Sequence, residues 1–264
     1  MNMPMVVIGQ YIPGRSILHR LDPRTKILLS LAVVIALFTV ESSWSYGMLA
    51  LLIATAVAIS GVPVKMVLRG LRPLLFVMIL TFGLHLFMDP GEEIFRIWKL
   101  RATDTGLRLG LTTVVRLTLL ITATSMVTLT TSPIAFTDGL EKILHPLSVI
   151  GVPAHELAMM MTIALRFIPT LLEETDKIMK AQMARGADFD SGNMVKRAKA
   201  MVPVLVPLFV SAFRRADELA MAMEARCYRG GQGRTRLRQL KFGGIDAVAV
   251  MVVFAYLTTA VVLF

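Results

Sequence analysis

The chain has 264 residues, of which 55% are hydrophobic, and its formal net charge at pH 7 is +10. This composition argues against an ordinary soluble domain and is typical of polytopic membrane proteins. The basic excess lies beside apolar segments, where the positive-inside rule accounts for it more simply than a nucleic-acid partner does.

Sequence motifs for nucleotide hydrolysis and metal binding are missing. The single cysteine, Cys227, excludes an internal disulfide, and the four histidines are too scattered for a metal site. The chain has neither a Gly-rich phosphate loop ending in Lys-Ser/Thr nor a Gly-x-Ser-x-Gly nucleophile motif. We therefore expect no metal, no cofactor and no catalytic residue.

The chain opens with an N-terminal arm, residues 1–26, whose late charges argue against a cleavable signal peptide. Residues 27–64 carry a single charge, so they predict two membrane helices joined by a tight turn at 41–47. Within that turn, Trp44 and Tyr46 are expected at the headgroup level.

Two more spans are predicted before residue 132. A basic loop at 65–72 precedes the first of them, 74–88, and the second is 106–131. Between these two spans, residues 89–105 lack a basic excess and are expected outside the cell. Residues 27–131 therefore form a predicted four-helix transmembrane region.

Polar and small residues inside these spans are assigned to packing. Gly106 and Gly110 have a small-xxx-small spacing that lets helices approach closely, and contacts within the chain are the favoured use. Arg116 is costly in lipid, so its side chain is expected to face protein or to reach a headgroup. His85 is expected to hydrogen-bond to a neighbouring helix rather than to act as a ligand.

The region 132–241 contains two long helical patterns, 154–184 and 193–225. Each is half apolar and half charged, and each apolar run is shorter than the roughly twenty residues that a span needs. We therefore predict cytoplasmic helices that lie along the membrane surface. In the second helix, Pro203 and Pro207 remove backbone donors from one side, which predicts a bend.

The two helical patterns end on the same motif. Ala184-Arg185-Gly186 closes the first and Ala225-Arg226-Cys227 closes the second. An arginine near a helix C-terminus suits the dipole, and a following glycine supplies a left-handed cap, so a single stop of this kind is common. Its repetition indicates a binding role, because each tip presents a planar, permanently charged group that suits a groove on another protein.

The distribution of lysine and arginine predicts the topology. Of the 28 basic residues, 23 lie in the segments 1–26, 65–72 and 132–241, against three in 89–105. After a basic linker, 242–264 forms a last span. These counts place the N-terminus in the cytoplasm, give five spans and leave the C-terminus outside.

Four stretches of the sequence carry a family resemblance. They are His19-Arg-Leu-Asp-Pro-Arg-Thr-Lys26, Arg166-Phe-Ile-Pro169, Ala181-Gln-Met-Ala-Arg-Gly186, and Phe213-Arg-Arg-Ala-Asp-Glu-Leu-Ala-Met-Ala-Met-Glu-Ala-Arg226 followed by Tyr228-Arg-Gly-Gly231. Over nearly the whole chain, the sequence resembles the transmembrane T component of energy-coupling factor transporters, the bacterial and archaeal vitamin-uptake relatives of ABC transporters. Cys227 departs from the glycine common in this family, which puts a left-handed cap there in question.

The resemblance implies an all-α, multi-pass protein of the bacterial or archaeal cell membrane that couples ATP hydrolysis by other subunits to uptake. Two cytoplasmic ABC-type ATPase subunits would bind the tips, through Ala184, Arg185, Gly186, Ala225 and Arg226. A separate substrate-binding membrane subunit would bind the vitamin. Flexible methionines and small residues on the two helices are candidates for contacting that subunit. They are Met159, Met160, Met161, Ala212, Ala216 and Ala220.

Two alternatives remain open at this stage. A T component dedicated to cobalt, nickel or biotin would share these features, although the length and the Gly9-Gln-Tyr-Ile-Pro-Gly14 opening look more like the type shared between substrates. From another class, a membrane-bound transferase could use Asp188 and Asp190 on a metal or phosphate. Two carboxylates in a Gly-flanked loop are more often a solvated turn.

Overall fold

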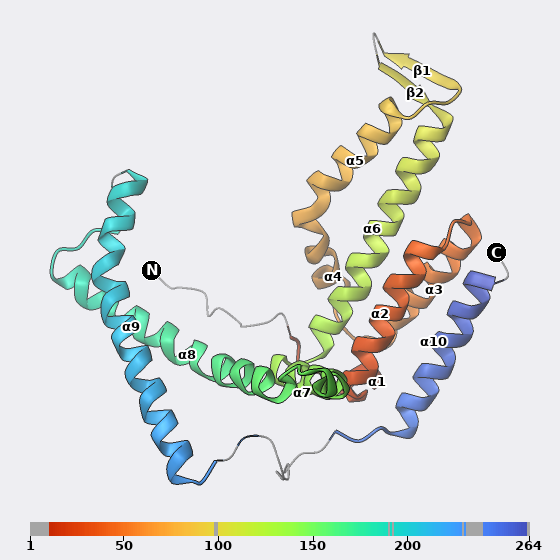
Figure 1. The fold of residues 1–264 in the computed structure, drawn as a ribbon. Coiled ribbons are helices and arrows are strands. Elements are labelled where there is room, and N and C mark those ends of the chain that lie inside the picture. Colours follow the sequence, from red (N-terminus) through yellow and green to blue (C-terminus); the bar gives the residue numbers. More distant parts are fainter. Residues whose placement is uncertain are drawn as a thin grey trace. The chain divides into compact units, whose positions relative to one another are not determined.

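The computed structural model describes residues 11–97, 100–189, 191, 193–228, 230 and 240–262. The chain divides into two compact units, Met1–Ile143 with Arg238–Phe264, and Leu144–Leu237. Helices account for nearly all of the described secondary structure, so the predicted all-α class is confirmed (Figure 1).

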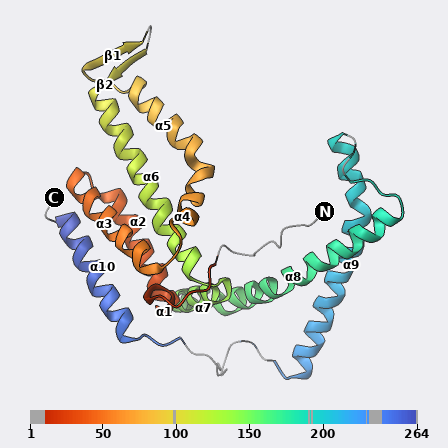
Figure 2. The ribbon, with the colours of Figure 1, turned by 180° about the vertical axis from the view of Figure 1, so that it is seen from behind.

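The first unit is a helical bundle with a small outer sheet. Its core lies where α2, α3, α6 and α10 meet (Figure 2). Leu37 and Leu49 are completely buried there. In chain order, the elements of this unit are α1 (Ile17–Arg20), α2 (Pro23–Thr39), α3 (Ser43–Ser60), α4 (Val64–Leu71), the 3₁₀ turn η1 (Arg72–Leu74), α5 (Leu75–Met88), β1 (Glu93–Ile97), β2 (Leu100–Thr103), α6 (Asp104–Thr130), α7 (Pro133–Leu144) and α10 (Gly244–Val262).

Four helical stretches in the described residues are long and apolar enough to cross a membrane. They are α3, the continuous stretch α4 to α5, α6, and α8 (Ala154–Ala184) of the second unit, whereas α10 counts as a shorter apolar helix. Our expectation that α8 falls short of a span is therefore corrected. Its first eighteen residues carry only two charges, Glu156 and Arg166, so length and composition do not separate α8 from the spans.

The basic segment before the third predicted span is a helix and not a loop. Residues 64–71 form α4, which η1 joins to α5. Lys65, Arg69 and Arg72 recur at intervals of four and three residues, which is the spacing of one helical face. The charges that we interpreted as a loop signal are the polar face of an amphipathic helix.

The predicted outer segment contains an antiparallel hairpin that we did not predict. Strands β1 and β2 pair Glu93 with Thr103 at one end and Ile97 with Leu100 at the other. The Thr103 hydroxyl donates to the Asp89 carbonyl at 2.9 Å and accepts from the Gly106 amide at 3.1 Å. Thr103 therefore ends the sheet and caps the N-terminus of α6 at the same time.

The intramembrane arginine faces protein, as predicted. Arg116 Nε donates to the Tyr46 hydroxyl at 2.8 Å, and that hydroxyl donates to the Val40 carbonyl at 3.0 Å. Tyr46 is only 6% exposed because its side chain packs against α6, and its placement at the headgroup level stays a prediction. Trp44 is 76% exposed, as an interfacial residue would be.

The two predicted packing glycines are confirmed, and the histidine differs in detail. Gly106 and Gly110 are buried against α5, where a larger residue would collide with the backbone of His85 and with the Phe82 ring. His85 Nδ1 forms a hydrogen bond with the Asp89 carboxylate at 2.7 Å. That partner follows α5 itself and does not belong to a neighbouring helix, as we had expected.

Buried hydrogen bonds join the beginning of the bundle to its last helix. Asp246, at the start of α10, accepts from the Asp22 amide and the Gly243 amide, both at 2.8 Å. The Asp22 carboxylate caps α2 and pairs with the Arg24 guanidinium at 2.8 Å. Burial alone would raise the pKa of Asp22, but the bonds from Arg24 outweigh it and hold this pKa below its ordinary value.

The second unit consists of η2 (His145–Ile150), α8 and α9 (Met194–Ala225). The bounds of α8 and α9 agree with the predicted 154–184 and 193–225, with Asn193 as the N-cap of α9. The two long helices cross each other in both views (Figures 1 and 2). Both helices continue through their internal prolines.

Candidate functional site

The end of α8 is a Schellman motif. Arg185 is the C-cap, and Gly186 follows it with φ of +89°. The Gly186 amide donates to the Met183 carbonyl at 2.9 Å, and the Ala187 amide donates to the Gln182 carbonyl at 3.0 Å. These two bonds satisfy carbonyls that a helix end would otherwise leave without a partner.

The end of α9 has the same geometry although the residue after the arginine differs. The Cys227 amide donates to the Glu224 carbonyl at 2.8 Å, and the Tyr228 amide donates to the Met223 carbonyl at 3.0 Å. Cys227 has φ of +55° and is the only described non-glycine residue with a positive φ. The left-handed cap that the sequence put in question therefore forms, at a steric cost of about 1 to 2 kcal/mol.

Both arginines are solvent-exposed at these tips. Arg185 and Arg226 are exposed, and the guanidinium of neither makes a hydrogen bond or ion pair with another described residue. Their tip neighbours Ala184, Gly186 and Ala225 are exposed as well. Each tip can therefore offer a complete guanidinium to a carboxylate or to the carbonyl end of a helix on another protein.

The tips lie at opposite ends of the helix pair. The Tyr228 hydroxyl, just past the tip of α9, lies 3.3 Å from His155 Nε2 and 2.9 Å from Met159 Sδ. His155 and Met159 belong to the first two turns of α8, whereas Arg185 is at its far end. Because α8 has 31 residues and an α-helix rises about 1.5 Å per residue, the two tips are on the order of 45 Å apart.

An ion pair braces α8 and α9 between these ends. Arg215 Nη2 of α9 donates to the Glu174 carboxylate of α8 at 3.0 Å, and both side chains are partly shielded from solvent. Together with the Tyr228 contact, this ion pair links α8 to α9. The predicted bend at Pro203 and Pro207 stays a prediction.

The apolar faces of these helices are largely uncovered within their unit. Met160 and Met161 are 55% and 42% exposed, and Ala216 and Ala220 are exposed, whereas Met159 and Ala212 are partly buried. The middle of α9 adds a row of large exposed apolar side chains that we did not single out from the sequence. The row is Val202, Leu205, Val206, Phe209, Val210 and Phe213. An apolar surface of this kind marks a contact with lipid or with another protein.

The acidic loop after α8 has an ordinary structural role. The Asp188 carboxylate accepts from the Ser191 amide at 3.1 Å and also bonds to the Ser191 hydroxyl, which makes a local turn. Asp190 lies outside the described residues. Among the described residues, no group of three or more His, Cys, Asp or Glu could hold a metal ion.

Comparisons with known proteins identify close relatives. A family model described as cobalt transport protein, CbiQ, matches residues 14–237. The energy-coupling factor transporter transmembrane protein EcfT of Thermosediminibacter oceani is 59% identical over 247 residues, which cover 94% of this chain and 93% of the relative. EcfT of Acidaminococcus fermentans is 56% identical over 95% of this chain and 93% of its own length. EcfT of Bacillus subtilis is 49% identical over 94% of both chains.

Proposed function

This chain belongs to the CbiQ/EcfT family of energy-coupling factor transporter transmembrane proteins, and we propose that it couples two cytoplasmic ABC-type ATPase subunits to a substrate-binding membrane subunit. The observation that carries this proposal is the pair of tips with one backbone geometry, each presenting an exposed arginine whose guanidinium has no partner among the described residues. Two similar tips suit two similar binding grooves, here called sockets, which a pair of related ATPase subunits would supply.

On the ATPase side, Arg185 and Arg226 would each enter a groove of one subunit, with Ala184, Gly186 and Ala225 allowing close approach. A guanidinium fork makes bidentate bonds to a carboxylate, which fixes orientation as well as affinity. Closure of the ATPase pair on ATP would then displace both tips. ATP would be bound by those subunits, and this chain would need no cofactor and catalyse no reaction of its own.

Between the tips and the membrane, the cross-linked pair α8–α9 would transmit the motion. The Glu174–Arg215 ion pair and the Tyr228 contact support movement of the two helices as one piece. The exposed residues Met160, Met161, Ala216 and Ala220, with the apolar row on α9, would contact the substrate-binding subunit. Methionine side chains adapt to different partners, which suits a coupling subunit that serves several substrate-binding subunits.

The proposed setting is the cell membrane, with the N-terminus and the two tips in the cytoplasm. The supporting observation is the concentration of 23 of the 28 basic residues in the arm, in the α4 region and in 132–241. In this arrangement α9 is an interfacial helix. A vitamin is the proposed cargo class, and the cobalt description of the matching family model favours a metal cation as the second candidate.

The docking proposal is tested by replacing both tip arginines. The double variant Arg185→Ala/Arg226→Ala is expected to lose co-purification of the ATPases and substrate uptake, because both sockets would lack their charged group. Arg214→Ala is the matched control, since Arg214 is an exposed arginine of α9 far from either tip. Undiminished ATPase association in the double variant would refute the proposal. Uptake assays with vitamins and with cobalt separate the two cargo classes.

A further inference from the structure

Helix α4 and its C-cap present a cationic face that no described residue neutralises. Lys65, Arg69 and Arg72 are exposed, and their charged groups have no hydrogen bond or ion pair with another described residue. At about 100° per residue, the three side chains lie within roughly 60° of one another around the helix axis. No aspartate or glutamate occurs between Gly61 and Met88. Three positive charges therefore share one face of a segment that has no carboxylate of its own.

The opposite side of α4 is fixed to the bundle. Val67 is 5% exposed and packs in a small apolar cluster with Met126 of α6. Gly70 lies on the same side, where an added Cβ would meet the Ser125 hydroxyl of α6 at 3.2 Å. The segment 117–137, which includes this half of α6, carries no charged residue. The packing therefore holds the cationic face away from α6, and α6 supplies no counter-charge to it.

The length of α5 places this face near the depth of lipid headgroups. Helix α5 has 14 residues and rises about 21 Å, whereas the hydrocarbon core of a bilayer is about 30 Å thick. The stretch α4 to α5 is a candidate span, so η1 and α4 complete the crossing and the α4 cations lie near the bilayer surface. Val64 and Leu68, which are 60% and 54% exposed, border the cationic face. They can enter the hydrocarbon while the long basic side chains reach the phosphates.

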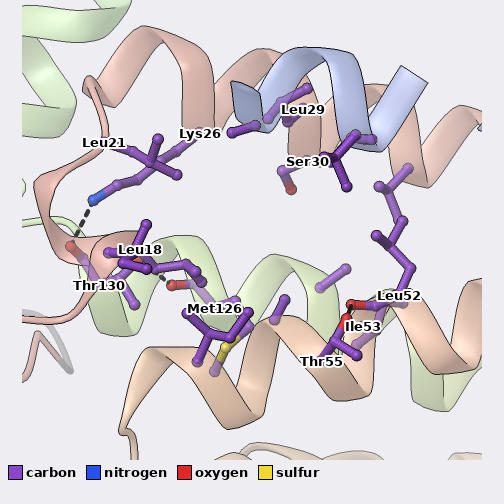
Figure 3. A pocket seen from close by; sticks show the side chains of 18 of the residues that line it. Leu18, Leu21, Lys26, Leu29, Ser30, Leu52, Ile53, Thr55, Met126 and Thr130 are labelled. Atoms are coloured by element: carbon purple, nitrogen blue, oxygen red, sulfur yellow. Dashed lines mark hydrogen bonds between the residues drawn. The ribbon is translucent and has the colours of Figure 1, made fainter. Parts of the chain in front are cut away.

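Two cations at the start of α2 differ from those of α4, because each already has a partner. Lys26 is buried in the wall of an apolar groove, and its Nζ donates to the Thr130 carbonyl at 2.9 Å (Figure 3). Arg24 pairs with the Asp22 carboxylate at 2.8 Å. These two charges help to hold the bundle together, whereas the three on α4 are free to bind a partner from outside.

We propose that α4 binds the headgroups of anionic phospholipids, with its three cations on phosphate oxygens and the flank of Val64 and Leu68 among the acyl chains. Charge complementarity selects anionic over zwitterionic lipids, because the segment 61–88 offers no carboxylate to the positive group of a zwitterionic headgroup. Bound lipid then holds this end of α5 at the membrane surface. The proposal rests on the chain's membership of a family of membrane proteins and is independent of ATPase docking.

The test uses native mass spectrometry of the full chain in mild detergent, titrated with phosphatidylglycerol or with phosphatidylcholine. Phosphatidylglycerol is expected to bind more tightly. Arg69→Gln should weaken its binding roughly five-fold, the usual effect of one basic residue near an anionic surface. The triple variant Lys65→Gln/Arg69→Gln/Arg72→Gln should weaken it on the order of a hundred-fold. Binding of phosphatidylcholine should change little in either variant.

Two controls separate the charge of α4 from other effects. Arg69→Lys keeps the charge and should retain the affinity for phosphatidylglycerol. Arg108→Gln removes an exposed arginine at the far end of α6 and should leave that affinity unchanged. Equal binding of the two lipids by the native chain, or phosphatidylglycerol binding that survives in the triple variant, would overturn the proposal. Loss of ATPase association in the triple variant with an unchanged lipid preference would also overturn it, since α4 would then be a protein-docking face.

Discussion

The ends of α8 and α9 are closed by the same two backbone hydrogen bonds, but they are supported differently. At the end of α8 a glycine adopts the left-handed conformation at little cost, and the guanidinium of the tip arginine has no hydrogen bond or ion pair with another described residue. At the end of α9 a cysteine adopts that conformation against its steric preference, and the next residue, Tyr228, binds back to the start of α8.

This difference indicates that docking geometry and mechanical support are separable. The backbone conformation that aims an arginine is present at both tips, so either residue after the arginine can supply it. The tyrosine contact exists at one tip only within the described residues, and it ties the tip of α9 to the helix that carries the other tip. We therefore expect the two ends to be alike in docking and unlike in rigidity.

The largest expected effect tests the likeness in docking. Arg185→Ala and Arg226→Ala, made singly, should each weaken ATPase association by about 2 to 4 kcal/mol, because each removes a charged group from the centre of a contact. Binding of the purified ATPases to the chain in nanodiscs measures this. Both losses should be of similar size, with Arg214→Ala unchanged. A loss confined to one variant would show that the two tips do not serve equivalent sockets.

The next effect tests the difference in the caps. Gly186→Ala should destabilise the tip of α8 by about 1 to 2 kcal/mol, because alanine meets the left-handed penalty that glycine avoids. Cys227→Ala is the matched substitution at the other tip and should change little, since the cysteine already bears that penalty. Hydrogen exchange of the Ala187 and Tyr228 amides reports the opening of each cap. Equal effects at the two positions would contradict the assignment of strain.

The sequence alone predicted the helices well where local signals agree. The bounds of α8 and α9 followed from long stretches without glycine and from the Ala-Arg stops, and the structure agrees with them to one residue. The elements that the sequence did not predict depend on residues that are neighbours in space. The hairpin β1–β2 lies in a segment whose mixed charges are typical of a loop. Helix α4 was not predicted because its basic residues, which lie on one face, are also typical of a cytoplasmic loop.

The candidate site was predictable in its residues but not in its geometry. The repeated Ala-Arg motif pointed to both tips, yet the family glycine missing at Cys227 argued against a cap that the structure forms. Contacts between residues far apart in the sequence left no local pattern. The Tyr228 contact with His155 and the link from Asp246 to Asp22 join residues 73 and 224 positions apart.

A smaller effect tests the brace at the tip of α9. Tyr228→Phe keeps the ring but removes the hydroxyl that contacts His155 and Met159, which should cost about 1 kcal/mol. ATPase association should persist while uptake per ATP hydrolysed falls, because the tip of α9 would move without carrying α8. Tyr256→Phe, on α10, is the matched control, since the Tyr256 hydroxyl has no hydrogen bond in the described part of the chain. If Tyr228→Phe left the uptake per ATP hydrolysed unchanged, the Tyr228 contact would have no mechanical role.

The smallest effect makes the two tips identical at the cap. Cys227→Gly should stabilise the end of α9 by about 0.5 to 1 kcal/mol, because glycine removes the left-handed penalty of about 1 to 2 kcal/mol but has more conformational freedom to lose on folding. The Schellman bonds remain available, so slower exchange of the Tyr228 amide and unchanged ATPase affinity are expected. If affinity rises together with stability, the strained cysteine weakens docking in the native chain, and the two tips differ in affinity as well as in support.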